Sequence, residues 1–210
     1  AVSETATHDP SGAVAGFADA TGRYLPLVCT LNAARILDAA CRILGKNHDE
    51  VAQLALAAKP GANGLTLLPY FEGERTPNRP KATGVFAGMN LNNSNQEDIA
   101  RAMVEGMLAG LADAVDSLVG LGVGVNRILL IGGAAKNPAI PVIASALFGR
   151  EVLVPPAGEY VADGAAKQAA WALLGNMPTW DLGEVTHHNS VATPDVMAKY
   201  KELKNRTEAW

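Results

Sequence analysis

The sequence Asn126-Arg-Ile-Leu-Leu-Ile-Gly-Gly-Ala-Ala-Lys-Asn-Pro138 decides how the rest of this chain is interpreted. Its apolar run from Ile128 to Ile131 predicts a strand buried on both faces, and Gly132-Gly133 ends that strand abruptly. Asn137 stands where a helix N-cap is expected, and Pro138 occupies the first helical position, where its missing N–H costs nothing. The stretch therefore predicts a strand, a glycine turn and the start of a helix.

This glycine turn has two interpretations. Paired glycines let a flat or anionic ligand come close to the backbone, and the free N–H groups at a helix start attract negative charge. The same spacing also occurs in ordinary strand-to-helix turns of α/β proteins, because short glycine motifs are weak signals. Spacing alone leaves both a nucleotide site and a purely structural turn open.

The composition is that of one globular domain of ordinary size, or of one and a half. The 210 residues suffice to bury a core, and the net charge of −4 comes without a lysine or arginine cluster. Such a charge distribution argues against nucleic acid as a partner. No apolar run approaches the roughly 20 residues of a membrane helix, and no signal peptide is recognised, so we expect no membrane partner.

Cysteine and histidine do not form a metal-binding pattern in this sequence. Cys29 and Cys41 stand in apolar surroundings and are expected to be reduced core residues of a cytoplasmic protein. His8 and His48 are isolated, and the His187-His188 pair lies in a polar stretch. The sequence therefore predicts no metal ligand.

The first part of the chain predicts short strands followed by two helices. A helix is expected from Thr30 or Asn32 to Leu44, and a second helix is expected to start at Asn47 or Asp49. Before these helices, turn signals separate three short stretches that are expected to form antiparallel hairpins, at residues 2–5, 13–18 and 24–28.

A proline-rich, charged segment follows a brief apolar run at residues 65–68 and extends from Pro69 to Lys81. Loops of this composition usually lie on the surface. Arg75 is expected to be buried within it and to form an ion pair with Glu72 or Glu74.

The second part predicts alternating strands and helices. Residues 84–89 are expected to form a strand, and Ser94 with Glu97 to form a capping box at the start of a long, core-facing helix. Asp98 and Asp163 are interpreted as helix caps. The elements expected after the glycine turn are a helix at 138–148, a strand at 152–154, a small-residue helix at 163–174 able to pack on a sheet, and an amphipathic helix from Thr193 toward Trp210.

The order of these elements predicts the fold class. Without an inserted helix and loop at about residues 46–82, the order is β-β-β-α-β-α-β-α, which fits a mixed five-stranded sheet flanked by helices. This α/β pattern is that of the actin-like ATPase and ribonuclease-H-like domain. We expect this domain to span residues 1–175 and a tail with a terminal helix to span residues 176–210.

Several motifs together resemble the C-terminal half of the FGGY carbohydrate kinases. Gly84-Val-Phe-Ala-Gly-Met89, followed after eight residues by Asp98-Ile-Ala-Arg-Ala-Met-Val-Glu105, is similar to the C-terminal signature of that family. Ile131-Gly-Gly-Ala-Ala-Lys-Asn137 resembles its adenosine motif, and Tyr160-Val-Ala-Asp-Gly-Ala-Ala166 resembles the start of its closing helix. Glu72-Gly-Glu-Arg-Thr-Pro77 looks like a loop of the xylulokinase branch.

The resemblance implies transfer of the ATP γ-phosphoryl group to a sugar hydroxyl, in a cleft between two actin-like domains. The sugar site, the first-domain phosphate loop and the aspartate base of the family have no counterpart here, so no catalytic residue is assigned. We expect this fragment alone to bind ATP or ADP weakly and to be inactive, because phosphoryl transfer depends on positioning by both domains. Mg²⁺ is implied with the nucleotide, without an identified protein ligand.

The resemblance also assigns a set of nucleotide contacts. Asn137 is expected to hydrogen-bond the nucleotide or to cap the helix, and Lys136 to approach a phosphate or to remain solvated. The residues expected on the adenosine and α-phosphate side of the nucleotide are Gly132, Gly133, Ala134, Lys136 and Asn137, with Asn32 and Arg35 near the adenine ring.

Other functions remain open at this point. A dinucleotide-binding oxidoreductase would need a third glycine, which is absent, and an acidic residue after the next strand, whereas Glu151 precedes it. A non-enzymatic actin-like nucleotide-binding module would lack the signature at residues 84–105. Within the family, D-xylulose is the favoured sugar, with gluconate, ribulose, rhamnulose and glycerol as alternatives. A homodimer also stays open.

Overall fold

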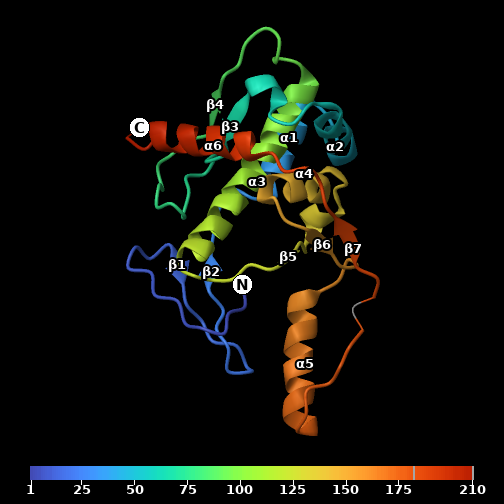
Figure 1. Cartoon of the computed structure of the whole chain (residues 1–210). Coiled ribbons are helices and arrows are strands. Elements are labelled where there is room, and N and C mark those ends of the chain that lie inside the picture. Colours follow the sequence, from blue (N-terminus) through green and yellow to red (C-terminus); the bar gives the residue numbers. More distant parts are fainter. Residues whose placement is uncertain (182, 210) are drawn as a thin grey trace.

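The computed structural model describes residues 1–181 and 183–209, so Leu182 and the expected helix end at Trp210 lie outside the described residues. The fold is α/β and is built around α3 (Gln96–Gly120), which runs through the middle of the molecule in Figure 1. Three shorter helices pack along α3, namely α1 (Arg35–Leu44), α2 (His48–Ala57) and α4 (Ala139–Phe148).

The helix α3 supplies the centre of the core, as its apolar spacing predicts. Met103, Met107 and Leu108 are buried, so these methionines fill the core. Its N-cap is Asn95, whose Oδ1 accepts a hydrogen bond from the Asp98 N–H at 2.8 Å. The predicted Ser94–Glu97 capping box is therefore wrong by one position, and Asp98 lies in the first turn instead of at the cap.

The helices α1 and α2 confirm one predicted start and correct another. Asn47 caps α2 in a full capping box with Glu50. Asn32 does not cap α1, because its side chain donates to the backbone oxygen of Gly73 at 2.6 Å and to Oε2 of Glu74 at 3.0 Å. As a result α1 begins at Arg35, without a side-chain cap.

The strands form three small sheets instead of the predicted five-stranded sheet. β1 (Val14–Ala15) pairs with β2 (Leu27–Val28), and β3 (Thr66–Leu68) pairs with β4 (Val85–Ala87), both antiparallel. The predicted strand at residues 2–5 is reduced to a single bridge between Ser3 and Tyr24. The N-terminal segments are too short to pair with the other sheets because tight turns interrupt them, with the Asp9 and Asp19 carboxylates accepting backbone N–H groups.

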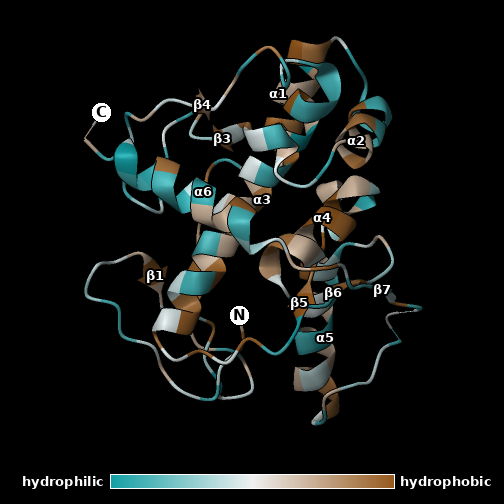
Figure 2. Cartoon of the chain, turned by 45° about the horizontal axis from the view of Figure 1, so that its top comes forward, coloured by the Kyte–Doolittle hydropathy of each residue, from teal (hydrophilic) through white to brown (hydrophobic). Residues whose placement is uncertain are grey.

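The third sheet carries the glycine turn. β5 (Ile128–Leu129) pairs in parallel with β6 (Val152–Val154), and β6 pairs antiparallel with β7 (Thr186–His188), a strand that the polar sequence did not predict. Figure 2 shows the largely hydrophobic α4 beside this sheet, and eight of its ten residues are buried. The prediction that residues 128–131 are buried on both faces is wrong, because Leu129 and Ile131 are about half exposed along an edge that no described strand covers.

Two helices complete the chain. α5 (Tyr160–Leu174) extends away from the core in Figures 1 and 2 and contains no buried residue, so the expected packing of this helix on a sheet is not found among the described residues. Asp163 lies in its first turn, and Glu159 holds the cap position. α6 (Pro194–Arg206) instead packs against α3 and β3 and buries Val196, Tyr200 and Leu203.

The part of the chain that the structure describes contains no helix long and apolar enough to cross a membrane. Cys29 and Cys41 are free thiols that are half-buried, so they are less enclosed than the predicted core positions.

Candidate functional site

The glycine turn requires glycine at its first position. Gly132 has φ of +95° and ψ of −178°, a backbone conformation that residues other than glycine rarely adopt. The chain then forms one 3₁₀ turn, η2 (Gly133–Lys136), before α4 begins. The predicted order of strand, glycine turn and helix is therefore confirmed, with an extra turn between the glycines and the helix.

Gly133 requires a different explanation. Its φ lies outside the left-handed range, and a Cβ built on it would meet no described protein atom within 4 Å. Neither backbone strain nor packing therefore demands glycine here. An open surface directly in front of a residue without a side chain allows a ligand to approach the backbone.

Asn137 links this turn to two helices. Its Oδ1 accepts a hydrogen bond from the Ala139 N–H at 3.0 Å, which is the capping contact that the sequence predicts. Its Nδ2 donates to the backbone oxygen of His48 at 3.4 Å. The side chain therefore holds the start of α4 beside the start of α2.

The turn separates two open pockets. The strand-end pocket, of about 570 Å³, lies between residues 130–136 and the segment from Val154 to Tyr160 that follows β6. The helix-start pocket, of about 390 Å³, lies between residues 133–137 and the first turns of α1 and α2. Both volumes fall in the range of small-molecule sites, about 300–1,000 Å³.

The helix-start pocket gathers most of the residues that the sequence assigned to a nucleotide. Five of those seven line it, and His48, Asp38 and Asp49 were not anticipated. Only the position of His48 and Asp49 beside the Asn47 cap could have indicated that they face the start of another helix. The five residues are Arg35, Gly133, Ala134, Lys136 and Asn137.

The two remaining predicted residues have different surroundings. Gly132 lines the strand-end pocket. Asn32 lines neither pocket, because it is buried and its amide is committed to Gly73 and Glu74. Its observed contacts make it an anchor for the segment that leads into α1.

The loop at residues 72–77 holds the start of α1. Glu74 is buried, and its carboxylate accepts hydrogen bonds from the Leu31 N–H at 2.7 Å and from the Arg75 N–H at 2.8 Å. Glu72 forms an ion pair with Arg35. The expected burial of Arg75 and its pairing with Glu72 or Glu74 are wrong, because the Arg75 side chain is exposed and both carboxylates face α1.

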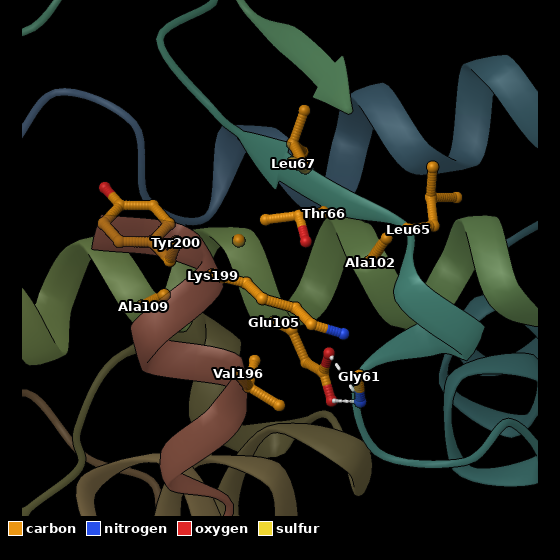
Figure 3. A pocket seen from close by; sticks show the side chains of 11 residues that line it. Gly61, Leu65, Thr66, Leu67, Ala102, Glu105, Ala109, Val196, Lys199 and Tyr200 are labelled. Atoms are coloured by element: carbon orange, nitrogen blue, oxygen red, sulfur yellow. Dashed lines mark hydrogen bonds between the residues drawn. The ribbon is translucent and has the colours of Figure 1, made fainter. Parts of the chain in front are cut away.

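The sequence signature at residues 84–105 stabilises a turn and does not line either pocket. Asp98 accepts two hydrogen bonds from Asn63, and Glu105 accepts two from the Gly61 N–H. Figure 3 shows Glu105 beside Gly61, in a cavity of only about 10 Å³, which is too small for a substrate. The signature therefore fixes the turn at residues 61–64 against α3.

Charged side chains of both signs line the two pockets, with Arg35 and Lys136 facing the carboxylates of Asp38, Asp49 and Glu159. Lys136 is exposed, and no described carboxylate lies within ion-pair distance of it. Within residues 1–181 and 183–209, no group of three or more metal-ligating side chains gathers in one place.

Comparison with known proteins decides the family. Residues 2–173 match the model of the FGGY family of carbohydrate kinases, C-terminal domain. The chain belongs to the FGGY family. This FGGY domain is 40% identical over 179 residues to a xylulose kinase of Streptomyces rubiginosus. The aligned region covers 85% of this chain and 35% of that protein.

Solved structures agree with this assignment. The crystal structure of xylulose kinase from Bifidobacterium adolescentis is 50% identical in sequence and superposes with a TM-score of 0.87. The match covers 97% of this FGGY domain and 41% of the crystallised chain. A xylulose kinase of Streptomyces coelicolor is 39% identical over 176 residues. The fold is thus the actin-like ATPase fold of FGGY sugar kinases, and the chain spans little more than a third of the length of the curated relatives named here.

Proposed function

We propose that this domain binds the adenosine part of ATP within an ATP-dependent xylulose kinase, which converts ATP and D-xylulose to ADP and D-xylulose 5-phosphate. The observation that carries the proposal is the convergence of Arg35, Gly133, Ala134, Lys136 and Asn137 on the helix-start pocket. These residues come from the first helix and from the turn before the fourth, so their convergence depends on the fold.

The chemistry of the pocket supports this ligand. Gly133 leaves the backbone accessible, and Ala134 adds only a methyl group, so a flat base can lie against the turn. Gly132 and Lys136 line the adjoining strand-end pocket, where the exposed ammonium group of Lys136 can approach a phosphate. Mg²⁺ would accompany the phosphates and neutralise their charge, and no described residue of this chain is assigned to it.

The choice of sugar is supported by relatives and not by this chain's own contacts. The two curated relatives described above are named xylulose kinases, and so is the structure at 50% identity. The Glu72–Pro77 loop, which resembles a loop of xylulokinases, anchors the segment before α1 through Glu74 and lines neither pocket. We place the whole protein in the cytoplasm, where ATP is available.

We also infer that residues 1–175 form the nucleotide-binding domain, with residues 46–82 as an insertion and residues 176–210 as a tail. The family match over residues 2–173 supports the first boundary. The tail helix α6 lies on the insertion strand β3 and on α3, so the tail supports the domain from outside the pockets.

Calorimetry with ADP tests the proposal directly. We expect this chain to bind ADP with a dissociation constant between millimolar and high micromolar, or roughly −4 to −6 kcal/mol, because half of the cleft is missing. A coupled assay should detect no xylulose phosphorylation by the chain alone and clear phosphorylation by the full-length protein. Absence of ADP binding by the full-length protein would contradict the proposal.

A further inference from the structure

His48 is held by two side chains of the neighbouring helix. Its Nε2 lies 3.2 Å from Oδ1 of Asp38, and its Nδ1 lies 3.5 Å from the Sγ of Cys41. Asp38 and Cys41 are three residues apart on α1, so they share one face of that helix and reach the same ring. Both ring nitrogens therefore have partners, and the plane of the imidazole is fixed.

The hydrogen-bonding roles of these groups are mutually consistent. Burial, reinforced by the Asp38 carboxylate, raises the pKa of the Cys41 thiol. The thiol therefore stays protonated and can donate a hydrogen bond to Nδ1 of His48. A ring that accepts at Nδ1 carries its proton at Nε2, which then donates to the carboxylate of Asp38. Cys41 therefore serves to orient the ring and is not an activated nucleophile.

The position of His48 connects this ring to the glycine turn. The backbone oxygen of His48 accepts the hydrogen bond from Asn137, and its side chain, 55% exposed, lines the helix-start pocket together with Ala134. Because both ring nitrogens are already engaged, the faces of the ring are what remains available to a ligand in the pocket. The apolar side of the same pocket is completed by Ala34 and Leu37.

We propose that His48 is a specificity-determining residue that stacks its imidazole face on the base of the nucleotide, and that Asp38 and Cys41 position this ring. The inference rests on the proposed function, because it concerns the same pocket. A π-face favours any flat aromatic base and gives nothing to a ligand that consists of phosphate alone. His48 therefore selects for the base, whereas Lys136 acts on the phosphates.

Two substitutions in the full-length protein separate stacking from hydrogen bonding. His48→Gln keeps polar groups and removes the ring, and we expect it to weaken ADP binding by about tenfold, the scale of one lost base–aromatic stack. His48→Phe keeps a flat ring and loses both hydrogen bonds, and we expect it to stay within about threefold of the parent. Binding of inorganic tripolyphosphate should be the same in all three proteins.

A spectroscopic readout and a matched control complete the test. The fluorescence of etheno-ADP should be quenched on binding to the parent and to His48→Phe, but not to His48→Gln. His187→Gln is the matched control, because His187 is also exposed and paired with a carboxylate, that of Glu151 at 2.9 Å, but lies outside both pockets.

The outcomes distinguish this inference from the proposed function. Unchanged ADP affinity in His48→Gln, or equal losses in His48→Gln and His48→Phe, would overturn the stacking role while leaving the nucleotide site intact. If the parent itself fails to bind ADP, the proposed function fails, and this inference fails with it.

Discussion

Glu105 accepts the backbone N–H of Gly61 with both of its carboxylate oxygens, at 3.0 and 3.1 Å, while its Oε1 also accepts a hydrogen bond from Nε of Arg101 at 2.6 Å. The Arg101–Glu105 pair is almost completely buried, and Arg101 donates further to the backbone oxygen of Ala55. One acidic residue in the signature thus ties α3, the end of α2 and the following turn together. This contact stabilises the fold and lies away from the nucleotide pockets.

Glu105→Ala should therefore reduce stability strongly. The substitution leaves the Arg101 guanidinium buried without its partner, which we expect to lower the free energy of unfolding by about 3–5 kcal/mol. Urea denaturation followed by circular dichroism measures this change. Glu97→Ala, an exposed position in the first turn of the same helix, is the control and should change stability by less than about 1 kcal/mol. Equal effects at the two positions would contradict a structural role for Glu105.

Gly133→Val should abolish ADP binding without unfolding the protein. No described atom lies within 4 Å of a Cβ at this position, so the larger side chain projects into the space in front of the turn. Calorimetry measures the loss of ADP binding, and thermal denaturation should show a midpoint close to that of the parent. Retained ADP binding would show that the turn is only structural.

Gly132→Ala, unlike the substitution at Gly133, should lower the stability of the fold. Its φ of +95° disfavours any L side chain, so we expect a loss of about 1 kcal/mol or more, although nothing lies within 4 Å of the added Cβ. Denaturation by urea should therefore separate the two neighbouring glycines. If Gly132→Ala is as stable as Gly133→Ala, the backbone here is less constrained than the structure indicates.

Removing apolar side chains should affect α3 and α5 very differently. Leu108 is fully buried in α3, so Leu108→Ala should lower the free energy of unfolding by about 2–5 kcal/mol. Leu173 in α5 is 86% exposed, so Leu173→Ala should stay within about 0.5 kcal/mol of the parent. Both values refer to this chain, measured by urea denaturation. A large loss at Leu173 would mean that α5 packs on the core in solution.

Stability should fall at alkaline pH because of two buried phenols. Burial raises the pKa of Tyr70 to about 12 and raises the pKa of Tyr200 as well. The folded state therefore keeps these protons more tightly than the unfolded chain, so their contribution is complete below pH 10 and is lost as the pH rises toward 12.

Tyr70→Phe checks the source of this pH dependence. The Tyr70 hydroxyl is buried and has no hydrogen-bond partner among the described residues, so its removal should change stability at pH 7 by little. The variant should lose less stability than the parent between pH 10 and 12, as measured by thermal denaturation at each pH. An unchanged alkaline loss would assign the effect to other groups.

Local signals in the sequence predicted those features that depend on near neighbours. The helix start at Asn47, the glycine turn at residues 132–133 and the Asn137 cap each involve groups within a few positions of one another, and all three are present. The family signature was also recognisable from residue types and spacing alone. The class of fold and the family follow from such short-range patterns.

Other features depend on partners far apart in the chain, which the sequence did not identify. Asn32 is of a residue type that often caps helices, but its side chain donates hydrogen bonds to Gly73 and Glu74, more than 40 residues away. The exposure of β5 and the separation of the strands into three sheets depend on which strand edges meet, which apolar content does not encode.

The sequence by itself determined the glycine turn and the family to which this chain belongs, because both reside in contiguous residues. Only the tertiary structure decided that Gly133 faces open space, that Asn32 is an anchor, and that His48 and Asp38 share a pocket with the turn. The physical reason is distance along the chain: about 90 residues separate His48 from Asn137, and only the packing of α1, α2 and α4 on α3 brings them into contact.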